Sequence, residues 1–238
     1  MSDRKKGCLR VENLTVHYQK NCALKNVSFS AESGESVAII GRNGAGKSTL
    51  LKAIAGLIQG VSGEIHWNES KLTKEAIRSL LSYLPQREEI DWNFPITVQG
   101  LVEMGLYSKA GSWGKFSKRH RNAADEAIDK MGLKDLTKRR IGELSGGQQQ
   151  RAFLARAVAG GATLFLLDEP FSGLDPSASE TLSQILVSLV QEGSLLLASH
   201  HDLPSIPQTF QKTLLLRTEQ IGFGVSSEIL SQTTLKEF

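Results

Sequence analysis

Cysteine is scarce in this sequence. Its 238 residues include two, Cys8 and Cys22, and both lie near the N-terminus. Two cysteines cannot form the disulfide framework that is typical of small secreted proteins, and they supply too few donors for a metal site. We therefore interpret both as structural residues and expect the protein to reside in a reducing compartment.

Long hydrophobic runs are absent as well. The longest, such as residues 164–167 and 195–198, are far shorter than the roughly 20 apolar residues that a membrane-spanning helix needs. The first residues, MSDRKKGCLRVENL, also lack the apolar segment of a secretory signal peptide. These absences predict a cytosolic chain, although it can still dock on a membrane component.

Neither sign of charge dominates the chain. The formal net charge is +3, and charged residues make up 22% of the sequence. This mild bias does not favour binding to nucleic acid, which usually needs a strongly basic face, and we expect no nucleic-acid partner. Repeats and low-complexity segments are also missing, so the composition is that of an ordinary globular domain.

The chain length fits one domain, or one core with a lobe inserted into it. Short apolar runs of the kind found in buried parallel strands occur on both sides of a mostly helical region. These runs span residues 36–40, 163–167 and 194–199. We predict an α/β fold in one domain over all 238 residues, with the core at 1–85 and 160–238 and a helical insertion at about 86–159.

The first chemical motif, GRNGAGKST, matches the phosphate-binding pattern G-x-x-x-x-G-K-[ST] and lies between an apolar strand and a helical segment. Its glycines let the backbone fold around an anion, and the positive end of the following helix attracts the same charge. Lys47 is expected to reach the β- and γ-phosphates of a nucleotide, and Ser48 to ligate Mg²⁺. The predicted nucleotide-binding residues of this P-loop are Gly41, Arg42, Asn43, Gly44, Ala45, Gly46, Lys47, Ser48 and Thr49.

The second motif, LFLLDEP, is an apolar strand that ends in two acids. Asp168 at the end of the strand suits a carboxylate that holds Mg²⁺, and Glu169 is then placed to polarise an attacking water. Acids after a strand are common, but beside a P-loop they supply what nucleotide hydrolysis needs, a metal ligand and an oriented nucleophile. We therefore predict that Glu169 is catalytic.

The third motif, LSGGQQQR, supplies a second phosphate-binding helix end, because a serine hydroxyl and unobstructed backbone N–H groups precede a helical segment. One nucleotide does not ordinarily need both this motif and the P-loop of the same molecule. Two chains arranged head to tail explain the pair, each lending its LSGGQ to the nucleotide on the other's P-loop. The predicted contacts across such a homodimer come from Leu144, Ser145, Gly146, Gly147 and Gln148.

The order of the P-loop, Gln86, LSGGQ, LDEP, SGLD and a late histidine resembles that of the nucleotide-binding subunits of ATP-binding cassette (ABC) transporters. The resemblance extends over roughly residues 9–235. It implies a P-loop NTPase core with a mostly parallel sheet, an N-terminal antiparallel β part and an inserted helical subdomain. It also implies ATP and Mg²⁺ as cofactors, and ATP hydrolysis coupled to transport across a membrane.

The same resemblance implies roles for single residues. Tyr18 is similar to the aromatic residue that stacks on adenine. Gln86 is similar to the glutamine that senses the γ-phosphate and joins the ligands of Mg²⁺. Asp175, in SGLD, matches the loop that crosses the dimer interface. The switch histidine is His200 or His201. The second directly precedes an aspartate, as the family's histidine usually does, which favours His201 as the catalytic one.

The stretch IDWNFPITV, followed by VEMGLY, narrows the resemblance to subunits of manganese, zinc and iron importers, although Leu106 stands where many relatives carry a basic residue. In the family, the loop at 85–98 receives a short cytoplasmic helix of the membrane subunit. The implied partners are a transmembrane permease and an extracytoplasmic solute-binding protein, with this chain on the cytoplasmic face of the membrane. We expect an exposed apolar socket formed by Trp92, Phe94, Pro95 and Ile96. The alternative is a loop that packs against its own helical lobe, and the two interpretations are compatible.

Other functions stay open. An importer of another solute, such as a siderophore or cobalamin, would use the same motifs, and so would an exporter. A soluble cassette ATPase that acts on ribosomes or DNA is the alternative from another class. Such relatives usually carry two cassettes in one chain, or a long coiled coil between the P-loop and the LSGGQ motif, and this sequence has neither.

Overall fold

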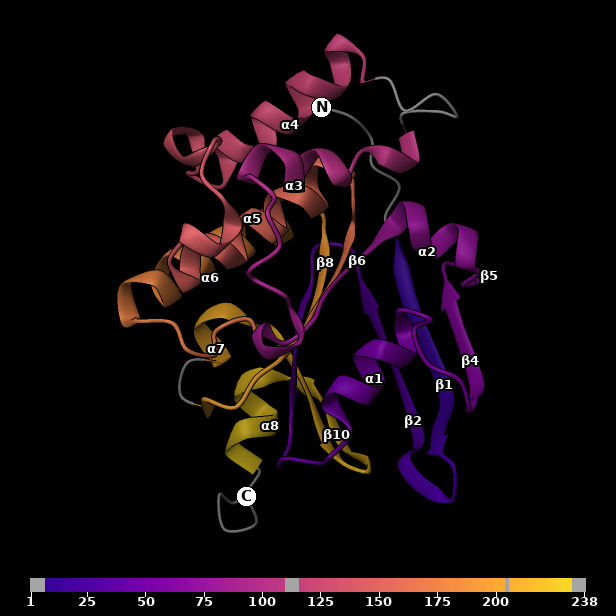
Figure 1. Ribbon diagram of the computed structural model, residues 1–238. Coiled ribbons are helices and arrows are strands. Elements are labelled where there is room, and N and C mark those ends of the chain that lie inside the picture. Colours follow the sequence, from indigo (N-terminus) through magenta and orange to yellow (C-terminus); the bar gives the residue numbers. More distant parts are fainter. Residues whose placement is uncertain (1–6, 110–115, 204–205, 233–238) are drawn as a thin grey trace.

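The computed structural model describes residues 7–109, 116–203 and 206–232 (Figure 1). Within these residues, the strands join into one ten-stranded sheet in the order β5-β4-β1-β2-β10-β9-β3-β8-β7-β6. The strands are β1 (Cys8–Tyr18), β2 (Asn21–Glu32), β3 (Ser36–Ile40), β4 (Val61–Trp67), β5 (Ser70–Lys71), β6 (Leu81–Leu84), β7 (Leu164–Leu167), β8 (Leu195–Ser199), β9 (Lys212–Arg217) and β10 (Glu219–Val225).

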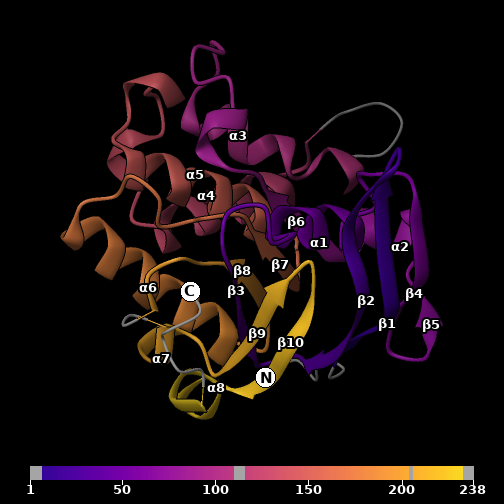
Figure 2. The ribbon, with the colours of Figure 1, turned by 90° about the horizontal axis from the view of Figure 1, so that it is seen from below.

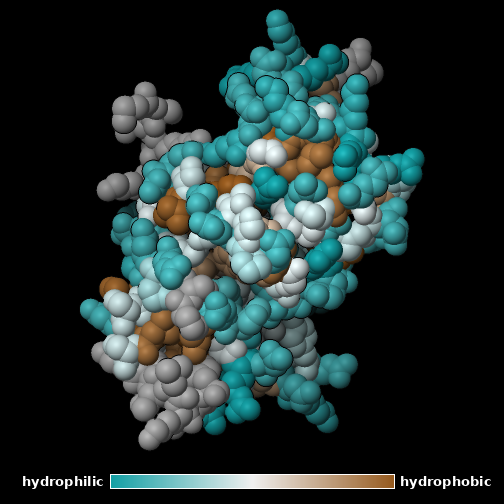
Figure 3. Space-filling model, turned by 90° about the vertical axis from the view of Figure 1, so that its left-hand side faces the viewer, coloured by the Kyte–Doolittle hydropathy of each residue, from teal (hydrophilic) through white to brown (hydrophobic). Residues whose placement is uncertain are grey.

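Helices cover the sheet and extend beyond one end of it (Figure 1). They are α1 (Lys47–Ile54), α2 (Lys74–Leu80), α3 (Val98–Met104), α4 (Lys118–Lys130), α5 (Gly146–Ala159), α6 (Pro176–Gln191), α7 (Ile206–Thr209) and α8 (Ser226–Gln232). None of the described helices is both long and apolar enough to cross a membrane. On the face shown in Figure 3, hydrophobic groups form separate patches among hydrophilic ones.

The sheet has two parts that differ in strand direction. β1 pairs with β2 and β4 in antiparallel fashion, whereas β3, β6, β7 and β8 run parallel to their neighbours. β10 joins the two parts, because it pairs with β9 on one side and, at Glu219 and Lys25, with β2 on the other. The predicted α/β fold, with a mostly parallel core and an antiparallel N-terminal part, is therefore confirmed.

The central strands are buried on both faces, which explains why their sequences are apolar at almost every position. Their side chains alternate between two hydrophobic clusters: Phe165 and Leu167 belong to one, and Leu164 and Leu166 to the other. The first cluster includes apolar residues of α3, α4, α5 and α6, and the second includes those of α1, β1 and β2. Figure 2 shows α4, α5 and α6 on one side of the central strands and β1 and β2 on the other.

The segment between β6 and β7, where a helical insertion was predicted, carries α3, α4 and α5. Thr97 caps α3 through its hydroxyl, which accepts the backbone N–H of Gly100 at 3.2 Å. Apolar residues such as Leu101, Ile128 and Phe153 join the three helices to one another and to the sheet in a single cluster. Because the cluster is continuous, the division into a core and an insertion stays a prediction.

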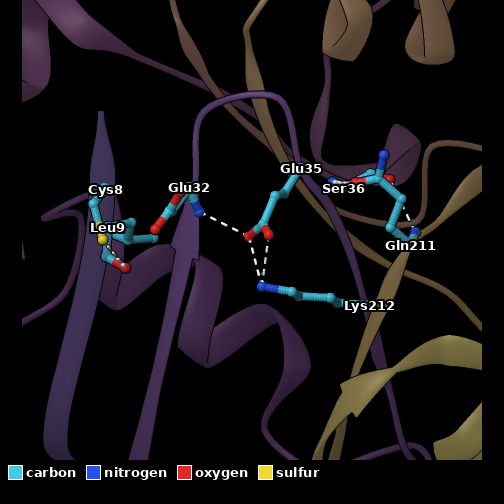
Figure 4. A network of polar contacts seen from close by, with 7 residues as sticks. All are labelled: Cys8, Leu9, Glu32, Glu35, Ser36, Gln211 and Lys212. Atoms are coloured by element: carbon cyan, nitrogen blue, oxygen red, sulfur yellow. Dashed lines mark hydrogen bonds and ion pairs between the residues drawn. The ribbon is translucent and has the colours of Figure 1, made fainter. Parts of the chain in front are cut away.

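A polar network holds the start of β3, the strand that leads into the P-loop (Figure 4). The carboxylate of Glu35 accepts hydrogen bonds from Lys212 Nζ and from the backbone N–H of Glu32, both at 2.8 Å. Ser36 and Gln211 exchange two further hydrogen bonds, at 3.2 and 3.1 Å. These contacts tie the connection between β2 and β3 to β9, the strand that pairs with β3.

Candidate nucleotide site

The P-loop follows β3 and leads directly into α1. Gly46 precedes the helix with a φ of 95°, a left-handed conformation that favours glycine. A Cβ atom at this position would lie 2.5 Å from Leu24 Cδ2 and 2.7 Å from the carbonyl oxygen of Ala23. Only glycine therefore fits where the loop passes β2, and this close approach holds the start of α1 against the sheet.

Lys47, the first residue of α1, has its side chain folded back under the loop. It is 6% exposed, and its Nζ atom donates to the carbonyl oxygens of Gly41 at 2.8 Å and Arg42 at 3.3 Å. A buried ammonium group needs such acceptors, because an unpaired charge is costly in the interior. The ammonium group of Lys47 thus lies beneath the loop, and the oxygens of an anionic ligand can replace its two carbonyl acceptors.

A hollow of about 500 Å³ opens above this loop, a size in the usual range for sites of small ligands. Its lining combines most of the P-loop with Gln86 and Glu169, which come from distant parts of the chain. The lining residues are Ala23, Asn43, Gly44, Gly46, Lys47, Ser48, Thr49, Gln86, Glu88, Glu169 and Ser172. Of the predicted P-loop residues, Gly41, Arg42 and Ala45 shape the loop without lining the hollow.

Asp168 ends the LFLLDEP strand with a carboxylate that is almost completely buried. Its Oδ1 atom accepts a hydrogen bond of 2.6 Å from Ser199 Oγ, and its Oδ2 atom one of 3.4 Å from the hydroxyl of Tyr83. Burial and the charge of Asp168 raise the pKa of Tyr83 far above its usual range, so this phenol stays a donor. Each carboxylate oxygen is therefore oriented by one hydroxyl group.

Glu169 adopts a left-handed conformation, with a φ of 48°. This region is uncommon for residues other than glycine, and it often marks a functional site because the surrounding structure must hold it. The backbone N–H of Glu169 donates to Ser199 Oγ at 2.7 Å. Glu169 lines the hollow together with Ser48 and Gln86. The turn thus places the residue that was predicted to be catalytic at the nucleotide site.

The predicted ligands of Mg²⁺ have suitable chemistry. Ser48 and Gln86, which carry a hydroxyl and a carboxamide, line the hollow, and Asp168, which is outside this lining, supplies a carboxylate next to Glu169 in the chain. Mg²⁺ prefers hard oxygen donors of these kinds and usually keeps several waters, so a few protein ligands suffice. The residues present therefore fit this ion, although the Mg²⁺ site itself stays a prediction.

The signature motif lies away from the hollow, at the start of α5. Ser145 caps the helix: its Oγ atom accepts the N–H of Gln148 at 3.4 Å, and its own N–H donates to the Gln148 side chain at 3.0 Å. Gly147 packs against α6, where an added Cβ atom would lie 2.8 Å from the Cβ of Ala178. None of the residues that line the hollow belongs to this motif.

Asp175 also lies outside the hollow and caps α6. Its Oδ1 atom accepts the backbone N–H of Ala178 at 2.9 Å, and Pro176 follows as the first residue of the helix. Because Ala178 contacts Gly147 as well, the starts of α5 and α6 meet there. The two elements that were predicted to face a second copy of the chain are therefore neighbours. The role of Asp175 at such an interface stays a prediction.

The adjacent histidines have opposite environments. His200 is buried, its ring 5.2 Å from Phe171 and 5.7 Å from Phe210 between centroids, and burial lowers its pKa to about 4, with repulsion from His201 adding to the effect. His201 is exposed. Both line a second hollow, of about 660 Å³, between α6 and α7. This difference favours His201 as the switch histidine, which stays a prediction because neither residue lines the nucleotide hollow.

Tyr18 lies at the end of β1 with 44% of its surface exposed, and it is absent from the lining of the hollow. An exposed ring at a strand end is available for stacking, and the assignment to adenine stays a prediction.

The loop at 85–98 differs in part from the expected socket. Phe94 and Pro95 are exposed, but Trp92 is half-buried, with its ring 5.6 Å from Phe153 and its Nε1 donating to the carbonyl of Arg87 at 2.9 Å. Ile96 likewise packs against the main hydrophobic cluster. The expectation that all four apolar side chains are exposed was therefore wrong. The helical lobe covers two of them.

Two residues that were not predicted from the sequence, Ser199 and Tyr83, orient Asp168. Both lie in apolar strands, where a single polar residue is easily taken for an ordinary strand position. The available signal was their register: β6, β7 and β8 are neighbours, and Tyr83 and Ser199 stand near the ends of the strands that flank the acids.

Comparisons with known proteins agree with the motifs. A model of the ABC transporter family matches residues 24–172. The zinc transport system ATP-binding protein TroB of Treponema pallidum is 43% identical over 216 residues, which cover 91% of this chain and 80% of that protein. The manganese transport system ATP-binding protein MntB of Bacillus subtilis is 37% identical over 229 residues, which cover 96% of this chain and 91% of that protein.

Among solved structures, one described as a metal-chelate type ABC transporter in an inward-facing conformation is similar to this chain, with a TM-score of 0.82 and 30% identity. The match covers 94% of this chain and 85% of that one. The family model spans more than half of the sequence, and both relatives exceed 30% identity over nearly its full length. The resemblance drawn from the motifs is thereby confirmed, and this chain belongs to the ABC transporter family as an ATP-binding subunit.

Proposed function

We propose that this chain is the ATP-hydrolysing subunit of an importer for divalent metal ions such as manganese, zinc or iron, and that it works as a homodimer on a separate transmembrane permease. The observation that carries the ATPase mechanism is the hollow that joins the P-loop to Gln86 and Glu169. The metal-ion part rests on the relatives, whose names assign zinc and manganese transport to them.

ATP would place its phosphates in the hollow at the start of α1. The P-loop backbone and the positive end of the helix favour an anion there. Lys47 exchanges its two carbonyl acceptors for oxygens of the β- and γ-phosphates, a small movement for a side chain that already lies under the loop. Tyr18, exposed at the end of β1, would stack on the adenine.

Hydrolysis then depends on oriented oxygens. Ser48, Gln86 and Asp168 would hold Mg²⁺, which when bound neutralises charge on the phosphates. Glu169 accepts a hydrogen bond from the attacking water and directs it at the γ-phosphate. His201, exposed beside the second hollow, would contact the γ-phosphate once the site has closed.

Closing the nucleotide site would need a second copy of this chain. One chain surrounds its P-loop hollow on one side, while its signature helix end lies elsewhere. In a head-to-tail dimer, Ser145 and the N–H groups at the start of α5 would complete the partner's site, with Asp175 close by. Two identical chains related by a twofold axis form two such sites.

The loop at 85–98 would connect the site to the permease. It begins next to Gln86, which lines the hollow, and it presents Phe94, of which 54% is exposed, at the surface. An exposed apolar side chain in a loop that also carries the exposed acids Glu88, Glu89 and Asp91 is typical of a docking surface. We propose docking at the cytoplasmic face of the membrane, in a system with an extracytoplasmic solute-binding protein.

The test is uptake of radiolabelled manganese, zinc and iron by cells that carry either the native chain or Glu169→Gln. We expect the variant to bind ATP but to lose hydrolysis, because the amide is a much weaker base than the carboxylate. Uptake of the transported metal should fall with it. Glu126→Gln, the same substitution at an exposed position of α4, is the matched control and should keep full uptake.

Unchanged uptake of all three metals by a variant without ATPase activity would remove the metal-ion assignment. The ATPase would stand in that case, and another solute would have to be tested. Full ATPase activity in Glu169→Gln would instead contradict the assigned role of Glu169.

A further inference from the structure

The hydroxyl group of Ser199 lies between the two acidic residues of the site. Ser199 is the last residue of β8 and is completely buried. β8 pairs with β7, the strand that ends just before Asp168, so the ends of the two strands lie side by side. A polar side chain in this apolar layer needs partners, because an unsatisfied buried hydroxyl is costly.

Ser199 forms one hydrogen bond with each of the two acidic residues. Its Oγ atom donates to Asp168 Oδ1 at 2.6 Å and accepts from the backbone N–H of Glu169 at 2.7 Å. A hydroxyl has one proton to give and lone pairs to accept with, so the two bonds can exist together. One small side chain thus holds the carboxylate of one acid and the backbone of the next.

Both contacts bear on geometry that the reaction needs. The bond to Asp168 is short, whereas the bond from Tyr83 to the other oxygen measures 3.4 Å, so Ser199 restrains the carboxylate more tightly. The bond from Glu169 supports a backbone whose φ is 48°, which is unfavourable for a residue with a side chain. Without it, the turn that places Glu169 at the hollow loses one support.

We propose that Ser199 is a positioning residue for ATP hydrolysis, which sets the orientation of Asp168 towards Mg²⁺ and of Glu169 towards the attacking water. It acts through these two residues and does not line the nucleotide hollow. His200 and His201 follow it directly in the chain, so the same hydroxyl links the histidine segment to the acids. This inference rests on the proposed mechanism of ATP hydrolysis.

The experiment compares the native chain with Ser199→Ala. We expect kcat to fall about 10- to 100-fold, as is typical when a residue that orients a metal ligand is removed. KM for ATP should stay within about twofold, because the P-loop contacts are untouched. The Mg²⁺ concentration that gives half-maximal activity should rise. Ser199→Thr, which keeps the hydroxyl, should recover most of the activity.

A second readout needs neither nucleotide nor activity. In the protein without ATP, the amide of Glu169 should exchange its proton at least about tenfold faster in Ser199→Ala, because its acceptor has been removed. Ser194→Ala is the matched control, since Ser194 is also buried and directly precedes β8, at the end away from the acids. It should leave the exchange, kcat and Mg²⁺ dependence unchanged.

The proposal is overturned if Ser199→Ala keeps the native kcat and Mg²⁺ dependence, or if the Glu169 amide exchanges at the native rate. It is also overturned if Ser194→Ala loses as much activity, because the effect would then reflect general destabilisation of β8. A native chain without ATPase activity contradicts the proposed mechanism instead, and the exchange measurement still reports on the contact itself.

Discussion

Two helices of this protein begin at motifs that were predicted to bind phosphate, but only α1 begins at the nucleotide hollow. α1 starts after Gly46, which has no side chain to cap it, and the P-loop leaves a space of about 500 Å³ above its first residues. α5 starts after Ser145, which forms a reciprocal pair of hydrogen bonds with Gln148. The first end is left available for a ligand, and the second is satisfied within the chain.

This difference is what the proposed dimer requires, in which each chain would carry two half-sites. An uncapped helix end needs an anion or water for its N–H groups, so α1 is prepared to bind a nucleotide by itself. A capped end is stable when exposed and needs no ligand in the single chain. In the proposed dimer, α5 would therefore remain stable by itself until a second copy brings a phosphate to it.

The largest effect is expected at the first helix end. Lys47→Ala removes the only side-chain ammonium that lines the hollow in the part of the chain described, and we expect ATP affinity to fall at least about 100-fold. Titration with a fluorescent ATP analogue measures it. Lys52→Ala, on the same helix but outside the hollow, is the control and should bind normally. Equal losses in both variants would contradict a specific role for Lys47.

At the start of α5, a charged substitution should distinguish the capping role of Ser145 from its proposed contact with a phosphate. Ser145→Asp keeps a good N-cap, so the melting temperature should change little, but its carboxylate would repel the phosphate of the partner's nucleotide. We expect ATP binding to one chain to persist and hydrolysis to fall by more than about tenfold. In the Glu169→Gln background, ATP should no longer drive dimer formation, as size-exclusion chromatography can test. Native hydrolysis in Ser145→Asp would exclude a phosphate contact at α5.

The glycines at the two ends should also differ in what they tolerate. Gly46→Ala forces a left-handed backbone and a clash with a carbonyl oxygen, so we expect a loss of about 3 kcal/mol in the free energy of unfolding. Gly147→Ala meets only a methyl group, and the gain in helix propensity offsets part of that contact, which leaves about 1 kcal/mol. Urea denaturation measures both. A larger loss of stability in Gly147→Ala than in Gly46→Ala would contradict this difference between the two helix ends.

The last prediction concerns the pH dependence that His200 contributes, and this residue belongs to neither helix end. Burial lowers its pKa to about 4 in the folded protein, so below about pH 6.5 the unfolded chain binds a proton that the folded one does not. Stability should therefore fall as the pH decreases, by about 1.4 kcal/mol between pH 7.5 and pH 5.5. His200→Phe, compared with the native chain in melts at both values, should remove this part of the pH dependence. An unchanged dependence would contradict the assignment to His200.

The sequence predicted the elements that depend on local patterns. The apolar runs became β3, β7 and β8, and the glycine-rich stretch became a loop before α1, because chain geometry limits what such residues can form. The pattern could not predict which apolar residues of 85–98 would be covered. Trp92 and Ile96 pack on a lobe whose helices come from later in the chain, and no local signal reports that contact.

The amino-acid sequence alone determined the α/β class, the nucleotide chemistry and the ABC family, because phosphate binding depends on glycines, one lysine and a helix start that are consecutive in the chain. Only the tertiary structure decided which groups meet. It placed Gln86 and Glu169 at the P-loop, buried His200 beside an exposed His201, and brought the hydroxyl of Ser199 to both acids. Those contacts join strands far apart in sequence, and only the packing of the parallel sheet sets their register.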